Sequence, residues 1–292
     1  MKQIFEMQFR ISLVAGTFAI MLAGCSIFKS DTLQSSIYPD NESVSKSQNL
    51  QLIWSDEFDY RGLPDPTKWS YEVGKIRNNE MQYFTKARLE NGRVEDGVLI
   101  IETRKEEYLG AQYTSASLTT KDKAEWIYGR IEIRAKLPTG TGMWPAIWMF
   151  GININEVGWP ACGEIDIMEN VGFTPDIIFA NIHTKAYNHI KRNHKGGNIL
   201  IPRPYDDFHI YAIEWFKDRI DFYADNINYF TYKNEDTGWE TWPFNKKFYL
   251  IINSAFGGTW GGQYGVDQSI LPQKFYIDYV RVYKASEENS SF

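Results

Sequence analysis

The chain has 292 residues, of which 43% are hydrophobic and 23% charged, so it can form a core and is not globally disordered. Its formal net charge of −6 provides no basic field for a polyanion, which excludes a nucleic acid as the main partner. With 4 His and 2 Cys, a disulfide scaffold and a cysteine-based zinc module are both excluded.

Residues 1–24 have the pattern of a bacterial export signal. Two cations precede an apolar run over residues 11–22, which is shorter than the roughly 20 residues of a membrane-spanning helix. Residues 22–25, Leu-Ala-Gly-Cys, resemble a lipobox, in which cleavage leaves a lipidated cysteine; a plain signal peptide is the alternative. We therefore expect an exported lipoprotein, anchored through Cys25 at the outer membrane or cell surface of a bacterium.

The rest of the chain divides into a tether, one domain and a short tail. Residues 25–50 are rich in Ser, Asp, Asn and Gln and lack apolar periodicity, which predicts a flexible tether. Residues 51–286 form the predicted domain, in which short alternating segments are broken by turn signals. Residues 287–292 are a polar tail.

Several segments of this domain have the two-residue period of β-strands. Residues 129–137 place Ile131, Ile133 and Ala135 on one face, and residues 275–283 are rich in Tyr and Val. Two further strands are predicted over residues 208–215 and 219–223, followed by a tight turn at residues 225–226. About 240 residues of closely spaced strands predict an all-β, two-sheet sandwich.

The segment over residues 163–170 carries three acids among apolar residues. In a regular strand Glu164 and Asp166 share one face and Glu169 points to the other. One β-bulge near residues 167–168 would bring Glu169 onto the same face as the other two. A helix would not bring the acids together, because it separates Glu164 and Glu169 by roughly 140° around its axis.

With this bulge, the acids have the arrangement of a glycosidase. The backbones of Glu164 and Glu169 would lie about 13 Å apart, and side chains that lean together leave roughly 5–6 Å between the carboxyl groups. That spacing is typical of a retaining enzyme, with one nucleophile and one acid. A solvated acidic face is disfavoured by like-charge repulsion, and a calcium or magnesium site by the lack of EF-hand spacing.

Four motifs resemble glycoside hydrolase family 16 in its laminarinase-like form. They are Gly-Glu-Ile-Asp-Ile-Met-Glu-Asn at 163–170, Trp-Ser-Asp-Glu-Phe at 54–58, Gly-Met-Trp-Pro-Ala-Ile-Trp at 142–148, and the closing segment at 275–283. The resemblance implies a concanavalin-like β-jelly roll with a concave cleft and endo-attack on β-linked glucans or galactans. By position it implies Glu164 as nucleophile, Asp166 as assisting acid and Glu169 as general acid/base.

Tryptophans near the acids are candidate platforms for sugar rings. On a strand, Trp144 and Trp148 share a face, which we expect to be that of the acids, whereas Ile147 would face the core. A flat indole offers apolar area to a pyranose and an N–H to a hydroxyl. The alternative is that both rings fill the core. Trp159 is a weaker candidate of the same kind.

Further polar and aromatic residues complete the predicted cleft. Asn78 and Glu80 lie in a loop that resembles the substrate-contacting loop of the family. His183 follows the acids on the next predicted strand and could hydrogen-bond Glu169 or a sugar hydroxyl. Trp260 lies between Gly pairs, where it would form a cleft wall or merely pack a loop.

Two groups of residues are candidates for metal binding. Many family members carry a structural calcium on the convex side, and Glu57, Gly97 and Asp278 match those positions, so the resemblance implies structural Ca²⁺ there. His189 and His194 lie in a Lys- and Asn-rich segment, which favours a surface loop over a metal site. Catalysis by the three acids requires no cofactor.

Together these features predict a monomeric, retaining endo-β-glucanase acting on β-1,3-glucan, on mixed-linkage β-1,3/1,4-glucan, or on both. A non-catalytic glucan-binding lipoprotein is one alternative, although a lectin has no use for three clustered acids. A galactan hydrolase, acting on agar or carrageenan, is the other; a sulfated substrate favours a basic cleft. The only local basic concentration is over residues 185–195.

Overall fold

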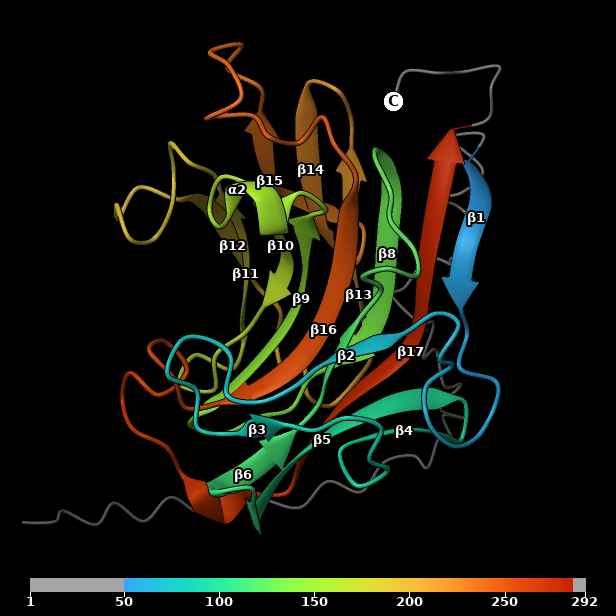
Figure 1. Cartoon of the computed structure of the whole chain (residues 1–292), viewed down its shortest axis with the longest axis vertical. Helices are drawn as coiled ribbons and strands as arrows, with labels where there is room; N and C mark the ends of the chain where they lie inside the picture. The colour runs from blue at the N-terminus through green and yellow to red at the C-terminus, as the bar shows by residue number, and fades with distance from the viewer. Residues whose placement is uncertain (1–49, 286–292) are drawn as a thin grey trace, which may run out of the picture. The chain divides into compact units, whose positions relative to one another are not determined.

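The computed structural model describes residues 50–285, which form two β-sheets packed on a shared core (Figure 1). The predicted signal, Cys25, nearly all of the tether and the polar tail lie outside the described residues. Within the part that is described, no helix has the length and apolar character needed to cross a membrane.

The larger sheet has ten strands. Eight of them follow the order β15-β14-β13-β8-β17-β5-β6-β3, while β1 pairs with β17 and β4 pairs with β5. Their bounds are β1 Leu50–Asp56, β3 Tyr83–Phe84, β4 Gly92–Glu95, β5 Val98–Tyr108, β6 Ala111–Ser115, β8 Gly129–Lys136, β13 His209–Trp215, β14 Arg219–Ala224, β15 Ile227–Lys233 and β17 Gln273–Ala285.

The smaller sheet has seven strands in the order β12-β11-β10-β9-β16-β7-β2. Its two longest strands, β9 and β16, are paired and bend together (Figure 1). The bounds are β2 Ser70–Glu72, β7 Ser117–Thr119, β9 Met143–Gly151, β10 Glu164–Glu169, β11 Ile177–His183, β12 Lys195–Leu200 and β16 Phe248–Phe256. The short helices α2 (Ile154–Val157) and η1 (Gln268–Ile270) lie in connections.

The strands predicted from alternation are confirmed. In β8 the side chains of Ile131, Ile133 and Ala135 are fully buried, and the residues between them are more polar. The predicted strands near residues 208–223 are β13 and β14, and the turn that follows them has Asp225 in a left-handed conformation, with φ of 51°. Such a conformation is what a tight hairpin turn requires.

The core lies between the two sheets. From the smaller sheet, Ile147 and Met149 of β9 and Ile165 of β10 point inward, where they join Ile133 and Val280 of the larger sheet in one cluster. Because alternate residues of a strand face opposite sides, the neighbours of these residues on β9 and β10 point away from the core. The predicted sandwich is therefore confirmed. The side chains on the outer face of the smaller sheet do not belong to this core and are free to form a binding site.

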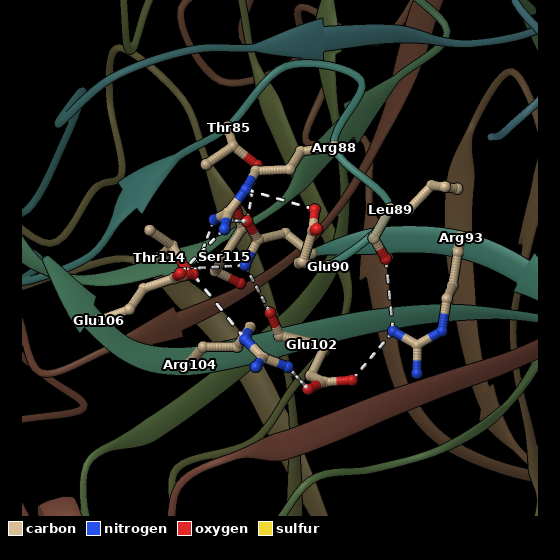
Figure 2. Close-up of polar contacts among 11 residues, drawn as sticks. Thr85, Arg88, Leu89, Glu90, Arg93, Glu102, Arg104, Glu106, Thr114 and Ser115 are labelled. Carbon is tan, nitrogen blue, oxygen red and sulfur yellow. Dashed lines mark hydrogen bonds and ion pairs between the residues drawn. The ribbon is translucent and has the colours of Figure 1, made fainter. Parts of the chain in front are cut away.

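A network of paired charges lies beside β5, in the larger sheet (Figure 2). Arg88 donates from its two terminal nitrogens to the two carboxylate oxygens of Glu106, at 2.7 and 2.8 Å. Arg93 donates to Glu102 at 2.9 Å, and Arg104 also contacts Glu102. The hydrogen bond from Arg88 is the main reason why the pKa of Glu106 falls to about 2. Both carboxylates of this network, Glu102 and Glu106, therefore lie beside an arginine.

Candidate active site

A β-bulge in β10 brings the three predicted acids to one face. Asp166 is paired with Trp148 of β9, but Met168 is paired with the very next residue of β9, so Ile167 is the extra residue. Ile167 and Met168 are both buried in the core, and Glu169 therefore returns to the outer face. The bulge predicted from the spacing of the acids is confirmed.

The acids line a pocket of about 440 Å³ on the outer face of the smaller sheet. β9, β10, β11 and β16 provide its floor, and the loops around residues 78, 189 and 260 provide its walls. Of the residues predicted for the site, nine line this pocket: Asn78, Glu80, Trp144, Trp148, Glu164, Asp166, Glu169, His183 and Trp260. Trp159 does not line it but contacts one of the acids.

Glu169 is held by two neutral donors. Trp144 donates its indole N–H to Oε1 at 3.0 Å, and Asn181 donates its amide to Oε2 at 2.7 Å. Glu169 is 9% exposed, and this burial raises the pKa of its carboxyl group, while the two hydrogen bonds act in the opposite direction. Both oxygens are thus oriented without a positive charge.

Glu164 is held by one indole and lies next to a second acid. Trp159 donates its N–H to Oε2 of Glu164. Burial is the largest cause that raises the pKa of Glu164 well above its usual range, and the charge of Asp166 is the next. The hydrogen bond from Trp159 and the nearby His183 work against this rise.

The imidazole of His183 faces Asp166, which corrects our expectation. We predicted Glu169 or a sugar hydroxyl as its partner, but β11 is paired with β10 so that His183 lies opposite Glu164, and its Nε2 is 3.3 Å from Oδ2 of Asp166. The contact with a sugar hydroxyl stays a prediction. Asn181, two residues earlier on the same face, takes the place beside Glu169. The pKa of Asp166 is also raised well above its usual range, by burial and by the charge of Glu169.

Across residues 50–285, none of the three acids forms an ion pair with Lys or Arg, and His183 is the only basic side chain within ion-pair distance. These three carboxyl groups, of which Asp166 and Glu169 are buried and Glu164 is half-buried, cannot all be ionised near neutral pH, because each charge raises the cost of the next. The site therefore holds at least one proton, which can be given to a leaving group.

Aromatic rings enclose the Glu169 side of the pocket. Trp260 makes edge-to-face contacts with Trp144 and Phe179, at centroid distances of 5.5 and 5.2 Å. Trp148 lies on the predicted face, but it is only 5% exposed. The guanidinium of Arg77 covers its ring at 4.6 Å, so little of Trp148 is left to stack on a sugar.

The loop with Asn78 and Glu80 is tied into the pocket wall. The carboxylate of Glu80 accepts from the amide of Asn78 at 3.3 Å and from that of Gln82 at 2.7 Å. Burial raises the pKa of Glu80. The carbonyl of Asn78 accepts from the backbone N–H of Thr259 at 2.8 Å, which joins this loop to the loop of Trp260.

The sequence did not place several other residues that line the pocket, among them Arg77, Phe179, Asn181, His189 and His194. Phe179 and Asn181 could have been found, because they alternate with His183 along one strand and must share its face. Arg77 directly precedes the predicted loop. The two histidines come from a long loop, whose path the local sequence does not determine.

The predicted calcium residues fit a cation only in part. The carboxylate of Glu57 accepts from Arg281 at 2.8 Å, and that of Asp278 accepts from Arg134 at 2.5 Å, so both are neutralised by a guanidinium. Gly97 lies in the turn between β4 and β5. Calcium at this place stays a prediction, and it would have to draw on backbone carbonyls.

The model of the glycosyl hydrolases family 16 matches residues 78–281, which include the bulged strand, the pocket and the closing strand. The chain belongs to this family. This glycosyl hydrolase is 50% identical to a β-glucanase of Rhodothermus marinus over 273 residues. The aligned region covers 90% of this chain and 92% of that protein.

Solved structures agree with this membership. A laminarinase of Rhodothermus marinus superposes with a TM-score of 0.80 at 52% identity, covering 82% of this chain and 98% of that one. A non-specific endo-β-1,3(4)-glucanase superposes with a TM-score of 0.78 at 47% identity, covering 81% and 92%. The two-sheet jelly roll of the family is thus the fold of this chain.

Proposed function

We propose that this glycosyl hydrolase cleaves internal bonds of β-1,3-glucan and of mixed-linkage β-1,3/1,4-glucan by a retaining double displacement. The observation that carries the proposal is the bulged strand β10, which presents three carboxyl groups without an Arg or Lys partner to one pocket. The printed names of the similar proteins, β-glucanase, laminarinase and endo-β-1,3(4)-glucanase, support the substrate.

In the first step, a carboxylate oxygen of Glu164 attacks the anomeric carbon, and the bond from that carbon to the glycosidic oxygen breaks. Glu169 gives its proton to the departing oxygen, so the leaving sugar exits as a neutral alcohol. The indole N–H of Trp159 favours the anion of Glu164 that this attack requires. A proton held on Asp166 would give that anion a second donor.

In the second step, the Glu169 carboxylate takes a proton from water, and the resulting oxygen attacks the anomeric carbon. The bond to Glu164 breaks, which releases the sugar with its original configuration and restores the proton on Glu169. Trp144 and Asn181 hold Glu169 in one orientation through both steps. No cofactor is needed.

The test is release of reducing ends, with product sizing, on laminarin, mixed-linkage β-glucan and agarose in parallel. We expect short oligosaccharides from the two glucans, and β-anomers as the first products by proton NMR. Activity on agarose alone would make the galactan alternative correct, and α-anomers would overturn the retaining mechanism. Binding without any release would favour a glucan-binding protein.

We also propose that the chain is an exported lipoprotein, anchored through Cys25 at the outer membrane or cell surface, and that it acts as a monomer. The support is the sequence of residues 1–25. Radiolabelled palmitate should enter the full-length protein in a bacterial host and should be absent from Cys25→Ser. Equal labelling of the variant would refute the anchor, and light scattering of the soluble domain tests the monomer.

A further inference from the structure

Three of the four histidines of the chain gather at one side of the pocket. His183 ends β11, and His189 and His194 belong to the exposed loop that connects β11 to β12. The ring centroids of His189 and His194 lie 5.2 and 5.5 Å from that of His183. The proposed reaction uses neither of the loop histidines, so their place in the pocket needs another explanation.

The acids next to these rings supply further ligand atoms. One ligand atom each from Glu164, Asp166 and His183 lies within 4.8 Å of the others, and no other such group of acids, cysteines and histidines exists among residues 50–285. Ligands of a tetrahedral zinc ion lie roughly 3.3–3.6 Å apart, given bonds of about 2.0–2.2 Å. Side-chain rotations that move these atoms by about 1 Å would therefore bring them to the spacing that a zinc ion requires.

The loop histidines have the spacing of rings that share an ion. Two imidazoles on one tetrahedral zinc ion have centroids about 5 Å apart, given Zn–N bonds of about 2.0–2.1 Å. His189 and His194 both lie close to this distance from His183. His189 also packs on Trp159, the residue that donates to Glu164, with centroids 4.9 Å apart. Both rings lie outside the group formed by Glu164, Asp166 and His183, so one of them would complete a fourth position by an inward movement of the loop.

The buried groups of this cluster are incompletely satisfied. Asp166 is 2% exposed and His183 is 6% exposed. Nδ1 of His183 is buried and has no hydrogen-bond partner in the described part of the chain, and Oδ2 of Asp166, although 3.3 Å from Nε2 of His183, accepts no hydrogen bond there. A buried polar atom without a partner costs free energy, which a bound cation on the carboxylate would recover.

We infer that this side of the pocket binds a divalent transition-metal ion such as Zn²⁺, through Glu164, Asp166 and His183, with His189 or His194 as a fourth ligand. Imidazole and carboxylate together suit zinc or copper, whereas calcium prefers six to eight oxygen ligands. An ion held here occupies the carboxylate that attacks the sugar. The site is therefore an inhibitory one, and the metal competes with the glucan.

The test is calorimetric titration of ZnCl2 into metal-free protein that carries no histidine tag. We expect binding at a ratio of one to one with a Kd in the micromolar range. In parallel, Zn²⁺ should raise the KM for laminarin with kcat unchanged, and a chelator should reverse the effect. The calorimetry needs no turnover, so it remains informative even where the proposed glucanase activity fails.

Variants identify the ligands. The double variant His189→Gln/His194→Gln on the exposed loop should weaken zinc binding at least tenfold, and His183→Asn should do the same. His209→Gln is the matched control, because His209 lies on β13 of the other sheet and pairs with Asp225 at 2.9 Å. Zinc affinity equal to that of the unmodified protein in both test variants, or no binding below about 1 mM, would overturn the inference.

Discussion

Carboxylates cluster in two regions of this protein, and their surroundings are opposite. Beside β5, Glu102 and Glu106 are each contacted by arginines, and the pKa of Glu106 falls to about 2 (Figure 2). On β10, Glu164, Asp166 and Glu169 have no Arg or Lys partner among the described residues, and burial raises the pKa of all three.

This difference in surroundings distinguishes acids that stabilise the fold from acids that can take part in catalysis. An acid that is paired with a guanidinium keeps its charge at all ordinary pH values and stabilises the fold. An acid that is buried without a cation destabilises its own ionised form, so it can exchange a proton near neutral pH. The changes below would break or sharpen this comparison.

The largest effect should follow the loss of a reacting carboxyl group. We expect Glu164→Gln and Glu169→Gln to lower kcat by about 10³-fold or more, because each removes an obligatory step. Thermal unfolding should show that both variants fold at least as stably as the parent. Near-full activity in either would contradict the assignment.

Alanine variants then separate the two roles on an activated aryl glycoside. With azide, Glu169→Ala should yield a β-glycosyl azide, since the covalent intermediate on Glu164 still forms. Glu164→Ala should yield only an α-linked azide from a glycosyl donor with a good leaving group. The reverse pattern would exchange the two roles.

Asp166→Asn should lower kcat and yet raise stability. Burial raises the pKa of Asp166 above its value in the unfolded chain, so ionisation at neutral pH costs folding free energy. That cost is absent below the unfolded pKa of about 4 and grows as the pH rises towards the folded pKa. We expect the unfolding free energy to rise at pH 7 and the gain to shrink towards pH 4, which urea titrations at pH 4 and 7 would measure.

The two indoles should have separable effects on the pH profile. Trp144→Phe removes a donor that lowers the pKa of Glu169, so the alkaline limb of kcat/KM should move to higher pH. Trp159→Phe removes the donor to Glu164, so the acidic limb should move to higher pH instead. Each loss of a hydrogen bond to a charged group should cost about 1.5–3 kcal/mol, or about 10- to 150-fold in kcat/KM. Movement of the same limb in both variants would contradict these assignments.

Glu106→Gln should affect stability alone. The pKa of Glu106 in the fold is about 2, below its ordinary value of 4.5, so its contribution is present above pH 4.5 and is lost as the pH falls through 2. We expect a loss of about 1–2 kcal/mol at pH 7, less than the pKa alone implies because solvent screens this partly exposed pair. Glu90→Gln, whose carboxylate lies 3.3 Å from Arg88 and is more exposed, is the control and should cost less.

Calcium should have the smallest effect. If the ion binds near Glu57, Gly97 and Asp278, chelation should lower the midpoint of thermal unfolding by only about 1–3 °C, because arginines already neutralise both carboxylates. The kcat should not change, since these residues belong to the larger sheet and its connections and not to the pocket. A loss of activity on chelation would show that the metal has a different place.

Much of this arrangement could be predicted from local sequence. The alternation of residues 129–137 determined β8, and the spacing of Glu164, Asp166 and Glu169 required the bulge that the structure has at Ile167. Both predictions succeeded because they depend on side-chain direction along a single strand, which its own residues determine.

Features that depend on how distant segments meet could not be predicted. The pairing of β10 with β11 sets His183 against Asp166 and gives Asn181 to Glu169, and no local pattern specifies that register. The guanidinium of Arg77 covers Trp148 because a loop from the start of the domain folds over β9. Exposure of a tryptophan is therefore a tertiary property that its own strand does not reveal.

The pairing of β1 with β17 has a consequence for how a long polysaccharide reaches the enzyme. Leu50 lies opposite Ala285, so the chain enters and leaves the described domain at neighbouring positions of the ten-stranded sheet. The pocket opens on the outer face of the other sheet. Whatever precedes Leu50 thus joins the domain at the layer that does not carry the pocket. A glucan chain can lie across the pocket without crossing the point where the polypeptide chain enters the domain.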